Sequence, residues 1–342
     1  MFLCQQCSAL LQLVKHLHFF ALGFSIMQKI FQCKTCRLCL PCLKASTLFL
    51  HAMADVRKKY AENVDGLFFV DRSCINCDTC RQLAPQVFAE HQGEHSYVFA
   101  QPTTAEDTQH ALQALIACPT SSIGTTEKLS ILSALDSFPM LLEGSVYYCG
   151  FTSEDSFGAS SYYIQRAQGN WLIDSPRFTP HLVRKFEQLG GIAHIFLTHH
   201  DDVADATRYA AHFGATRHIH ERDAAAQPDS EHIFKGDLPI QLDDELVIIP
   251  TPGHTAGHSV LLYANTFLFS GDHLWWSPMR YALSASRSLC WYSWSAQIAS
   301  MEILLNYSFE WILPGHGARK KMTPDVMQAS LRQLIARMKT IS

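Results

Sequence analysis

The chain of 342 residues is too long for one small core, so its length predicts two domains. With 48% apolar and 17% charged residues, its composition is that of a globular protein and excludes a disordered or fibrous one. The formal net charge of −4 is unevenly distributed along the chain. Residues 1–54 hold five basic residues and no acidic one, so the remaining residues have a net charge of −9. A mildly acidic body lacks the basic stripe that a nucleic-acid groove needs, so no nucleic-acid partner is expected.

Residues 1–52 are expected to be an N-terminal extension, either a targeting segment or an upstream stretch before a start at Met53. Its apolar run is interrupted by charged and histidine side chains and is too short to span a bilayer, so no membrane partner is expected. Four cysteines spaced by threes could bind zinc or a cluster: Cys33, Cys36, Cys39 and Cys42. Tight cysteine gaps indicate a reducing compartment, which we take as the cytoplasm, or an organelle if the extension is a transit peptide.

Residues 53–128 are predicted to form a small domain of short elements. A strand precedes a cysteine loop, a short helix follows it, and residues 96–102 have the pattern of another strand. Thr104 and Asp107 form a capping-box pattern, which predicts a helix that continues to Cys118.

The cysteine pattern of this region is the strongest signal in the sequence. Cys74, Cys77 and Cys80 are spaced by threes, and Cys118 is followed by Pro119. Three such thiolates can hold one face of a cuboidal cluster while a distant turn supplies the fourth. Four cysteines can also bind zinc, although zinc sites usually use paired CxxC motifs. With APQVF and ACPTSSIG around the motif, about 70 residues resemble the single-cluster bacterial ferredoxins, and the resemblance implies one [4Fe–4S] cluster on these four cysteines.

Residues 129–143 are expected to be a linker with little core of its own, and residues 140–342 to form the second domain. From residue 145 onward, strands and helices alternate. Expected are hairpins at 162–174 and 258–272, strands near 194–200, 217–220, 245–254 and 310–317, and helices at 182–191, 204–214 and 322–339. Four segments rich in histidine or aspartate each follow an apolar strand, where α/β enzymes collect ligands in loops.

These four segments are HHDD (199–202), PTPGHTAGH (250–258), FSGDH (269–273) and LPGHG (313–317). In this order and at these separations they resemble the metallo-β-lactamase-fold hydrolases. The resemblance implies His254 as the third-loop histidine, Asp272 as an aspartate that bridges two metals, His316 as the last histidine and Asp174 as a structural aspartate. The expected fold class is α+β: a ferredoxin-like domain followed by a metallo-β-lactamase-like αββα sandwich.

The first of these loops departs from the family pattern His-x-His-x-Asp-His. One alignment gives His199 and Asp201 as ligands; a register shifted by two residues gives Asp205 and loses the histidines. The first predicts one divalent metal, zinc or iron, on His199, Asp201, His254 and Asp272. A second metal would have Asp272 and His316, with Asp202 or Asp205. Oxygen in place of imidazole makes the set harder and better suited to iron or manganese.

The leading hypothesis is a metal-dependent hydrolase of a small-molecule ester, thioester or similar bond. Asp202 or His258 is the candidate proton carrier, and His316 either binds a second metal or orients the substrate. Five aromatic residues are expected to be pocket walls or core packing: Trp275, Trp276, Trp291, Tyr292 and Trp294.

Two alternatives come from other classes of function. In the first, the second site holds redox iron that receives electrons from the cluster, and a partner protein supplies them, because no flavin or nicotinamide fingerprint is present. In the second, the protein is a sensor without catalysis, in which cluster oxidation alters a binding surface and the second site holds no metal.

Overall fold

The computed structural model describes residues 54–341, all within one compact unit, Ala52–Ser342. The expectations for residues 1–52, including the Cys33 to Cys42 set, lie outside the described residues. Among the helices of residues 54–341, none is both long enough and apolar enough to cross a bilayer.

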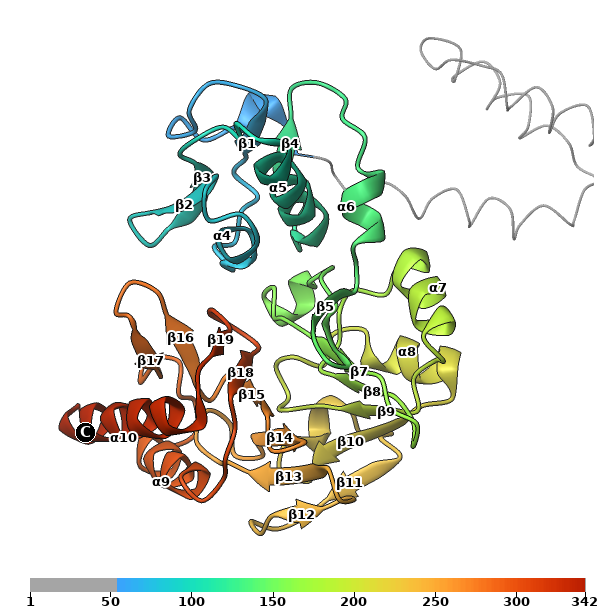
Figure 1. The fold of residues 1–342 in the computed structure, drawn as a ribbon, viewed down its shortest axis with the longest axis vertical. Helices are drawn as coiled ribbons and strands as arrows, with labels where there is room; N and C mark the ends of the chain where they lie inside the picture. Colours follow the sequence, from blue (N-terminus) through green and yellow to red (C-terminus); the bar gives the residue numbers. More distant parts are fainter. Residues whose placement is uncertain (1–53, 342) are drawn as a thin grey trace, which may run out of the picture. The chain divides into compact units, whose positions relative to one another are not determined.

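Residues 54–128, here called the cysteine module, contain seven elements, of which the sequence predicts two strands and two helices (Figure 1). They are η1 (Val56–Lys58), β1 (Phe68–Val70), α4 (Thr79–Leu83), β2 (Phe88–His91), β3 (His95–Val98), α5 (Ala105–Ala117) and β4 (Ile123–Thr125). β1 pairs with β4 and β2 with β3, both antiparallel. The Thr104–Asp107 capping box is formed, which explains where α5 begins.

The strand expected at residues 96–102 ends at Val98. Beyond it, the Gln101 side chain takes the place of a neighbouring strand: its Oε1 accepts from the Phe68 amide at 2.9 Å, and its Nε2 donates to the Phe68 carbonyl at 2.9 Å. One side chain therefore provides hydrogen-bond partners for the backbone at the edge of β1, so no further strand has to pair there.

The segment expected to be a linker carries structure of its own. α6 (Leu132–Asp136) lies within it, and β5 (Met140–Glu143) joins the first sheet. Ala134 and Phe138 are fully buried, and the Phe138 ring packs against Tyr148 and Phe151. The segment was expected to have little core of its own, and the buried Phe138 side chain is what anchors it.

Residues 140–341, here called the two-sheet domain, contain a first sheet of seven strands in the order β11-β10-β9-β8-β7-β6-β5. Its strands are β5, β6 (Val146–Tyr148), β7 (Tyr162–Ile164), β8 (Trp171–Ile173), β9 (His194–Phe196), β10 (Thr216–His220) and β11 (His232–Phe234). Between them lie η2 (Glu154–Ser156), α7 (Pro180–Gln188), α8 (Ala206–Phe213) and η3 (Ala224–Ala226). β8, β9, β10 and β11 are mutually parallel, so their carboxyl ends meet at one edge of the sheet.

The second sheet has six strands in the order β12-β13-β14-β15-β18-β19. They are β12 (Ile240–Gln241), β13 (Leu246–Pro250), β14 (Ser259–Tyr263), β15 (Phe267–Gly271), β18 (Trp311–Pro314) and β19 (Lys320–Lys321). A small hairpin of β16 (Trp275–Ser277) and β17 (Ala282–Ser284) follows β15, and α9 (Trp294–Leu304) and α10 (Pro324–Thr340) complete the chain. The β14–β15 turn is at Ala264 and Asn265, as predicted, with φ of +52° and +48°.

The expected αββα sandwich is confirmed, because the sheets face each other and helices cover their outer sides (Figure 1). Between the sheets, the Tyr162 ring packs on Phe269 at 5.5 Å, and its hydroxyl donates to the Pro314 carbonyl at 2.7 Å. β15 and β18 are parallel, so the loops after them leave the same edge. This arrangement brings together the chain segments that follow β8, β9, β15 and β18.

One buried cation on the first sheet leads to a prediction about pH. The Arg217 guanidinium is nearly buried and donates to Glu231 at 2.9 and 3.1 Å, which lowers the pKa of that carboxyl to about 2. The native state therefore gains stability from this pair above the ordinary glutamate pKa and loses it as the pH falls toward 2. We expect Arg217→Gln to lower the free energy of unfolding near neutral pH and to lose less stability than the parent between pH 5 and pH 3.

Urea unfolding at each pH measures this difference, and Arg208→Gln is the control. Arg208 is half exposed and pairs with Asp205 at 3.2 Å, so its loss is worth little. If the free energy of unfolding of Arg217→Gln changed with pH in parallel with that of the parent protein, Arg217 would not be the cause of the lowered pKa of Glu231.

Candidate metal centre and cysteine site

The four cysteines of the module line one small cavity. Cys74 lies in the loop after β1, Cys80 in the first turn of α4, and Cys118 is the residue that ends α5. All four are free thiols. The left-handed backbone at Asn76 and Asp78, with φ of +60° and +72°, turns the loop around this cavity.

The surroundings of the thiols fit an iron–sulfur cluster. The Ser96 amide donates to Cys74 Sγ at 3.4 Å, and the Ser122 hydroxyl lies 3.3 Å from Cys118 Sγ. Burial raises the pKa of Cys77 to about 11 and the pKa of Cys80 well above its ordinary value. Buried thiolates of this kind form only with a cation beside them, and the irons of a cluster supply that charge.

Gly158 packs directly against this cavity from the two-sheet domain. A Cβ at this position would lie 2.5 Å from Cys77 Cβ and 2.9 Å from Cys77 Sγ, and the backbone has φ of +85°. We therefore expect Gly158→Ala to displace Cys77 and to lower the iron and acid-labile sulfide bound per chain. Gly93→Ala is the matched control, since its φ is +80° with nothing within 4 Å. Equal sulfide content in the two variants would show that Gly158 does not position Cys77.

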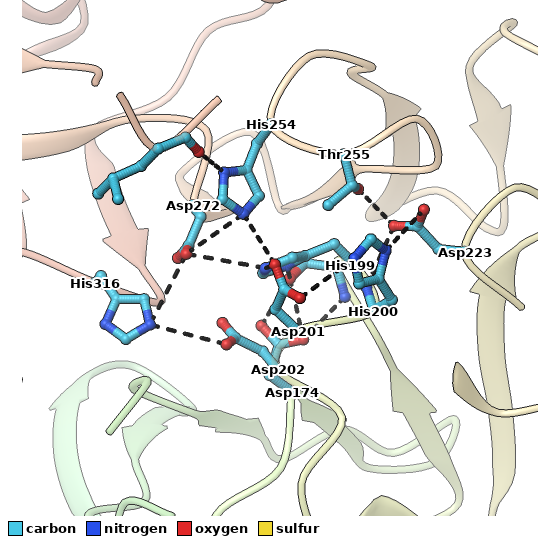
Figure 2. Close-up of polar contacts among 12 residues, drawn as sticks. Asp174, His199, His200, Asp201, Asp202, Asp223, His254, Thr255, Asp272 and His316 are labelled. Carbon is cyan, nitrogen blue, oxygen red and sulfur yellow. Dashed lines mark hydrogen bonds and ion pairs between the residues drawn. The ribbon is translucent and has the colours of Figure 1, made fainter. Parts of the chain in front are cut away.

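The histidine and aspartate loops converge on one carboxylate oxygen (Figure 2). Nε2 of His199, His254 and His316 lies 3.9, 3.7 and 3.8 Å, respectively, from Asp272 Oδ2. Two ligands that are each about 2.1 Å from a tetrahedral zinc lie about 3.4 Å apart. The spacing is therefore slightly wider than that of ligands around a bound ion.

The ligand atoms form two groups that share Asp272. His199, His254 and Asp272 make the first, and Asp202, Asp272 and His316 make the second, with ligand atoms within 4.8 Å of one another in each. Asp201 Oδ2 lies 3.4 Å from His254 Nε2 and 3.8 Å from His199 Nε2, beside the first group. The sequence predicted one metal with a second left open, and the structure offers donors for two.

Hydrogen bonds on the far side of each ring orient the first group. His254 Nδ1 donates to the Leu289 carbonyl at 2.6 Å, which leaves Nε2 facing the aspartates. His199 Nδ1 lies 2.9 Å from the Thr198 hydroxyl, and Thr198 contacts Asp174 through its amide and hydroxyl. Asp174 is thus the structural aspartate that the resemblance implied, holding Thr198 and through it His199.

The electrostatics of the site favour a bound cation. Burial and the neighbouring Asp272 carboxylate raise the pKa of Asp202 well above its ordinary value, and burial lowers the pKa of His199 to about 4. Nε2 of His199 and of His254 and both Asp202 oxygens are buried without a hydrogen-bond partner among the described residues. Unpartnered lone pairs that face one another, with carboxylates among them, fit a divalent metal.

The two alternatives for the first loop are distinguished by position. Asp201 reaches the first ligand group, as the first alignment predicts. Asp205 instead accepts from the Phe178 amide at 2.7 Å and pairs with Arg208 at 3.2 Å. Its contacts are therefore at the start of α8 and not with the ligand groups. The structure therefore favours the register with His199 and Asp201.

The candidate proton carriers are placed differently. Asp202 belongs to the second ligand group, with Oδ1 3.9 Å from His316 Nε2. His258 is fully buried; its Nδ1 contacts the Thr251 hydroxyl at 2.9 Å, and its ring stacks on His273. Burial and the adjacent His273 lower the pKa of His258 well below its ordinary value, which favours a neutral packing role over proton transfer.

The sequence pattern gave no role to His200 and Asp223. His200 contacts Asp201 at 3.2 Å and Asp223 at 3.2 Å, and Asp223 also accepts from the Thr255 hydroxyl and, at 3.0 Å, from the Gly257 amide. Asp223 thus ties the HHDD loop to the TPGH loop (Figure 2). The one sequence feature that could have indicated Asp223 is its position just after strand β10, since the other site residues also follow strands.

A cavity of about 1400 Å³ opens over the ligand groups. Of the five aromatic residues in question, Trp275 and Trp291 line it, whereas Trp276 and Trp294 belong to or pack against the core between the second sheet and its helices. Tyr292 is exposed. Both expected roles are therefore present, divided among the four tryptophans.

Comparisons with known proteins found one matching family model and several similar proteins. The family model described as the 4Fe–4S single-cluster domain of ferredoxin I matches residues 70–125. Residues 70–125 are a single-cluster [4Fe–4S] ferredoxin domain. The [4Fe–4S] cluster that the resemblance implied is the one named in the description of this family, and Cys74, Cys77, Cys80 and Cys118 all lie within the matched residues.

Two curated relatives are hydroxyacylglutathione hydrolases. The protein from Acidiphilium cryptum (strain JF-5) is 36% identical over 96 residues, which is 27% of this chain and 40% of that protein. The one from Fuscovulum blasticum is 33% identical over 107 residues, 30% of this chain and 42% of that protein. This chain thus spans about two fifths of the length of these relatives.

Solved structures to which this chain is similar include metallo-β-lactamases. Among solved structures, DIM-1 metallo-β-lactamase is 16% identical, covering 59% of this chain and 96% of that one, with a TM-score of 0.46. A metallo-β-lactamase family protein from Thermus thermophilus is 17% identical, covering 58% of this chain and 81% of that one, with a TM-score of 0.45.

Proposed function

We propose that the protein is a metal-dependent hydrolase that cleaves an ester or thioester of a small molecule. The observation that carries this proposal is the convergence of three histidine Nε2 atoms, from three separate loops, within 3.7–3.9 Å of Asp272 Oδ2. Both ligand groups lie at the wall of a cavity large enough for a small-molecule substrate.

The candidate ligands divide into two sets, one for each metal ion. His199, His254 and Asp201 would hold one ion, Asp202 and His316 the other, and Asp272 both. A divalent metal in such a site lowers the pKa of water and polarises a carbonyl, which is the chemistry of ester hydrolysis at neutral pH. Asp174 and the Leu289 carbonyl fix two of the histidines, so little reorganisation is needed when the ions bind.

The cavity walls indicate the kind of substrate. Phe157, Trp275 and Trp291 provide apolar surface. Arg319 contributes the cation: it stacks on Tyr148 at 4.1 Å, and its Nη1 is buried without a hydrogen-bond partner among the described residues. We infer a substrate that combines an apolar portion with an anionic group. The partial similarity to hydroxyacylglutathione hydrolases favours a thioester.

The test uses the full chain purified anaerobically, with its cluster intact and its second site loaded with zinc. Acyl thioesters of glutathione, simple carboxylic esters and a β-lactam are supplied in parallel, and released thiol or acid is measured. We expect thioester cleavage that is lost on chelation and restored by zinc. His212→Gln is the control variant, because His212 is a surface histidine paired with Glu187. A zinc-loaded protein that cleaves none of these bonds would overturn the proposal.

A further inference from the structure

The cysteine module and the metal-ligand loops line the same cavity. Cys77, Asp78 and Arg81 contribute from the module, and Asp272 and His316 from the two-sheet domain. Hydrolysis requires no electron, so this shared wall is not explained by the proposed function. A candidate ligand of the cluster, Cys77, and a candidate ligand of the second metal group, His316, therefore line one open cavity.

The turn after η2 bridges the two sites. The glycine of this turn, Gly158, packs on Cys77, and the Thr79 hydroxyl donates to its carbonyl at 3.3 Å. The residue before it, Phe157, lines the cavity, and its ring centroid lies 6.3 Å from that of His316. The order in space is therefore Cys77, Gly158, Phe157, His316.

Phe157 combines two features, both of which Tyr281 shares in the described part of the chain. Its backbone is left-handed, with φ of +50°, which is strained for a residue with a bulky side chain. Its side chain is also not placed there by burial, since Phe157 is 57% exposed. A large aromatic group held in a costly conformation with much of its surface in water gains little from packing. What distinguishes Phe157 is its position in the cavity wall, between His316 and the glycine that packs on Cys77.

We propose that the Phe157–Gly158 turn couples the two centres electronically, so that an electron given to a cluster on Cys77 reaches a redox-active metal at Asp202, Asp272 and His316. With both groups bound, such a transfer would move one electron and no atoms: a reduced cluster held by the cysteines would be oxidised, and ferric iron held by Asp202, Asp272 and His316 would be reduced to ferrous iron. A one-electron donor protein would supply the electron to the cysteine module, and dithionite takes its place in the test.

The donor set supports iron in this position. Asp201 stands beside the first group, and two carboxylates, Asp202 and Asp272, dominate the second. Oxygen ligands with one or two imidazoles make a site that is harder than a three-histidine zinc site and suit iron. The inference goes beyond the proposed hydrolase, because the same loops would serve hydrolysis with zinc and electron acceptance with iron.

The experiment compares two forms of the full chain, both with an intact cluster. One carries ferric iron in the histidine–aspartate site and the other zinc, with metal content measured per chain. The cluster is reduced by a substoichiometric pulse of dithionite, and its EPR signal is followed by rapid freezing. We expect the signal to decay in the iron form, at a rate independent of protein concentration, while ferric iron is lost. It should persist in the zinc form.

Phe157→Leu tests the bridge itself. We expect decay of the cluster signal to slow several-fold in the iron form, while cluster and iron content stay those of the parent protein. Phe99→Leu is the control, because Phe99 is a partly exposed aromatic of the module that does not line the cavity. Equal decay in the iron and zinc forms, failure of the site to take up iron, or an unchanged rate in Phe157→Leu would each overturn the proposal.

The two proposals fail separately. Thioester cleavage is measured with zinc and no reductant, whereas electron transfer is measured with iron and no substrate. A protein that cleaves thioesters but shows persistent cluster signals would retain the hydrolase function and lose the electronic coupling. The reverse result would retain the coupling alone.

Discussion

Asp272→Asn is expected to remove metal from both ligand groups and to abolish hydrolysis while leaving the [4Fe–4S] cluster in place. Asp272 is the one residue that the two groups share, and its Oδ2 is the oxygen that three histidines face. Residues that merely orient ligands change metal affinity by about 10- to 100-fold, so loss of a shared ligand should cost about 100-fold or more. Metal per chain after equilibrium dialysis, with acid-labile sulfide measured on the same sample, tests this.

His316→Gln provides the matched comparison, because His316 belongs to the second group alone. We expect it to lose one bound metal and Asp272→Asn to lose both. Equal metal content in the two variants, or full metal content in Asp272→Asn, would contradict a shared carboxylate.

The second large effect is expected from Cys118→Ala, which removes the cluster ligand that lies farthest along the chain from the other three. Three remaining thiolates leave one iron without a protein ligand, so iron, sulfide and the visible absorbance of the cluster should fall to a small fraction of the parent values. Because a group bound by four thiolates stabilises the folded state that holds it, the free energy of unfolding should fall as well.

Cys149→Ala is the control for that experiment. Cys149 is also a fully buried free thiol, but it lies in the two-sheet domain and does not line the cysteine cavity. It should keep the sulfide content of the parent protein and lose only packing energy. Unchanged sulfide in Cys118→Ala would show that the cluster assignment is wrong.

Much of the fold follows from local chemistry that a sequence displays. The Thr104–Asp107 pair marks the start of α5, and Ala264-Asn265 marks the turn between β14 and β15. Glycines end α7 and α8, with Gly190 and Gly214 in left-handed conformations. These features depend on residues close together in the chain, so their pattern is sufficient.

The metal site was partly predictable for a different reason. His254, Asp272 and His316 each follow a strand, and parallel strands carry such residues to one edge of a sheet. From the sequence alone, the first loop could be aligned with the family's His-x-His-x-Asp-His pattern in two registers. Only the fold shows that Asp201 faces His254 while Asp205 turns toward Phe178.

The remaining features depend on packing between distant segments. Asp223 joins two loops through side chains that are more than 20 residues apart in the chain. Phe157 and Gly158 have no motif of their own, and their position between Cys77 and His316 arises only when the cysteine module packs on the two-sheet domain. No local pattern encodes such a contact.

The central claim is that one chain holds a [4Fe–4S] cluster and a separate metal site on histidines and aspartates. Its most direct test is the content of iron, zinc, manganese and acid-labile sulfide per chain after anaerobic purification, with EPR of the reduced sample. The account predicts about four irons and four sulfides and, beyond these, about one or two further metal ions. About four irons and four sulfides with no further metal, even after the protein is supplied with zinc or iron, would contradict it.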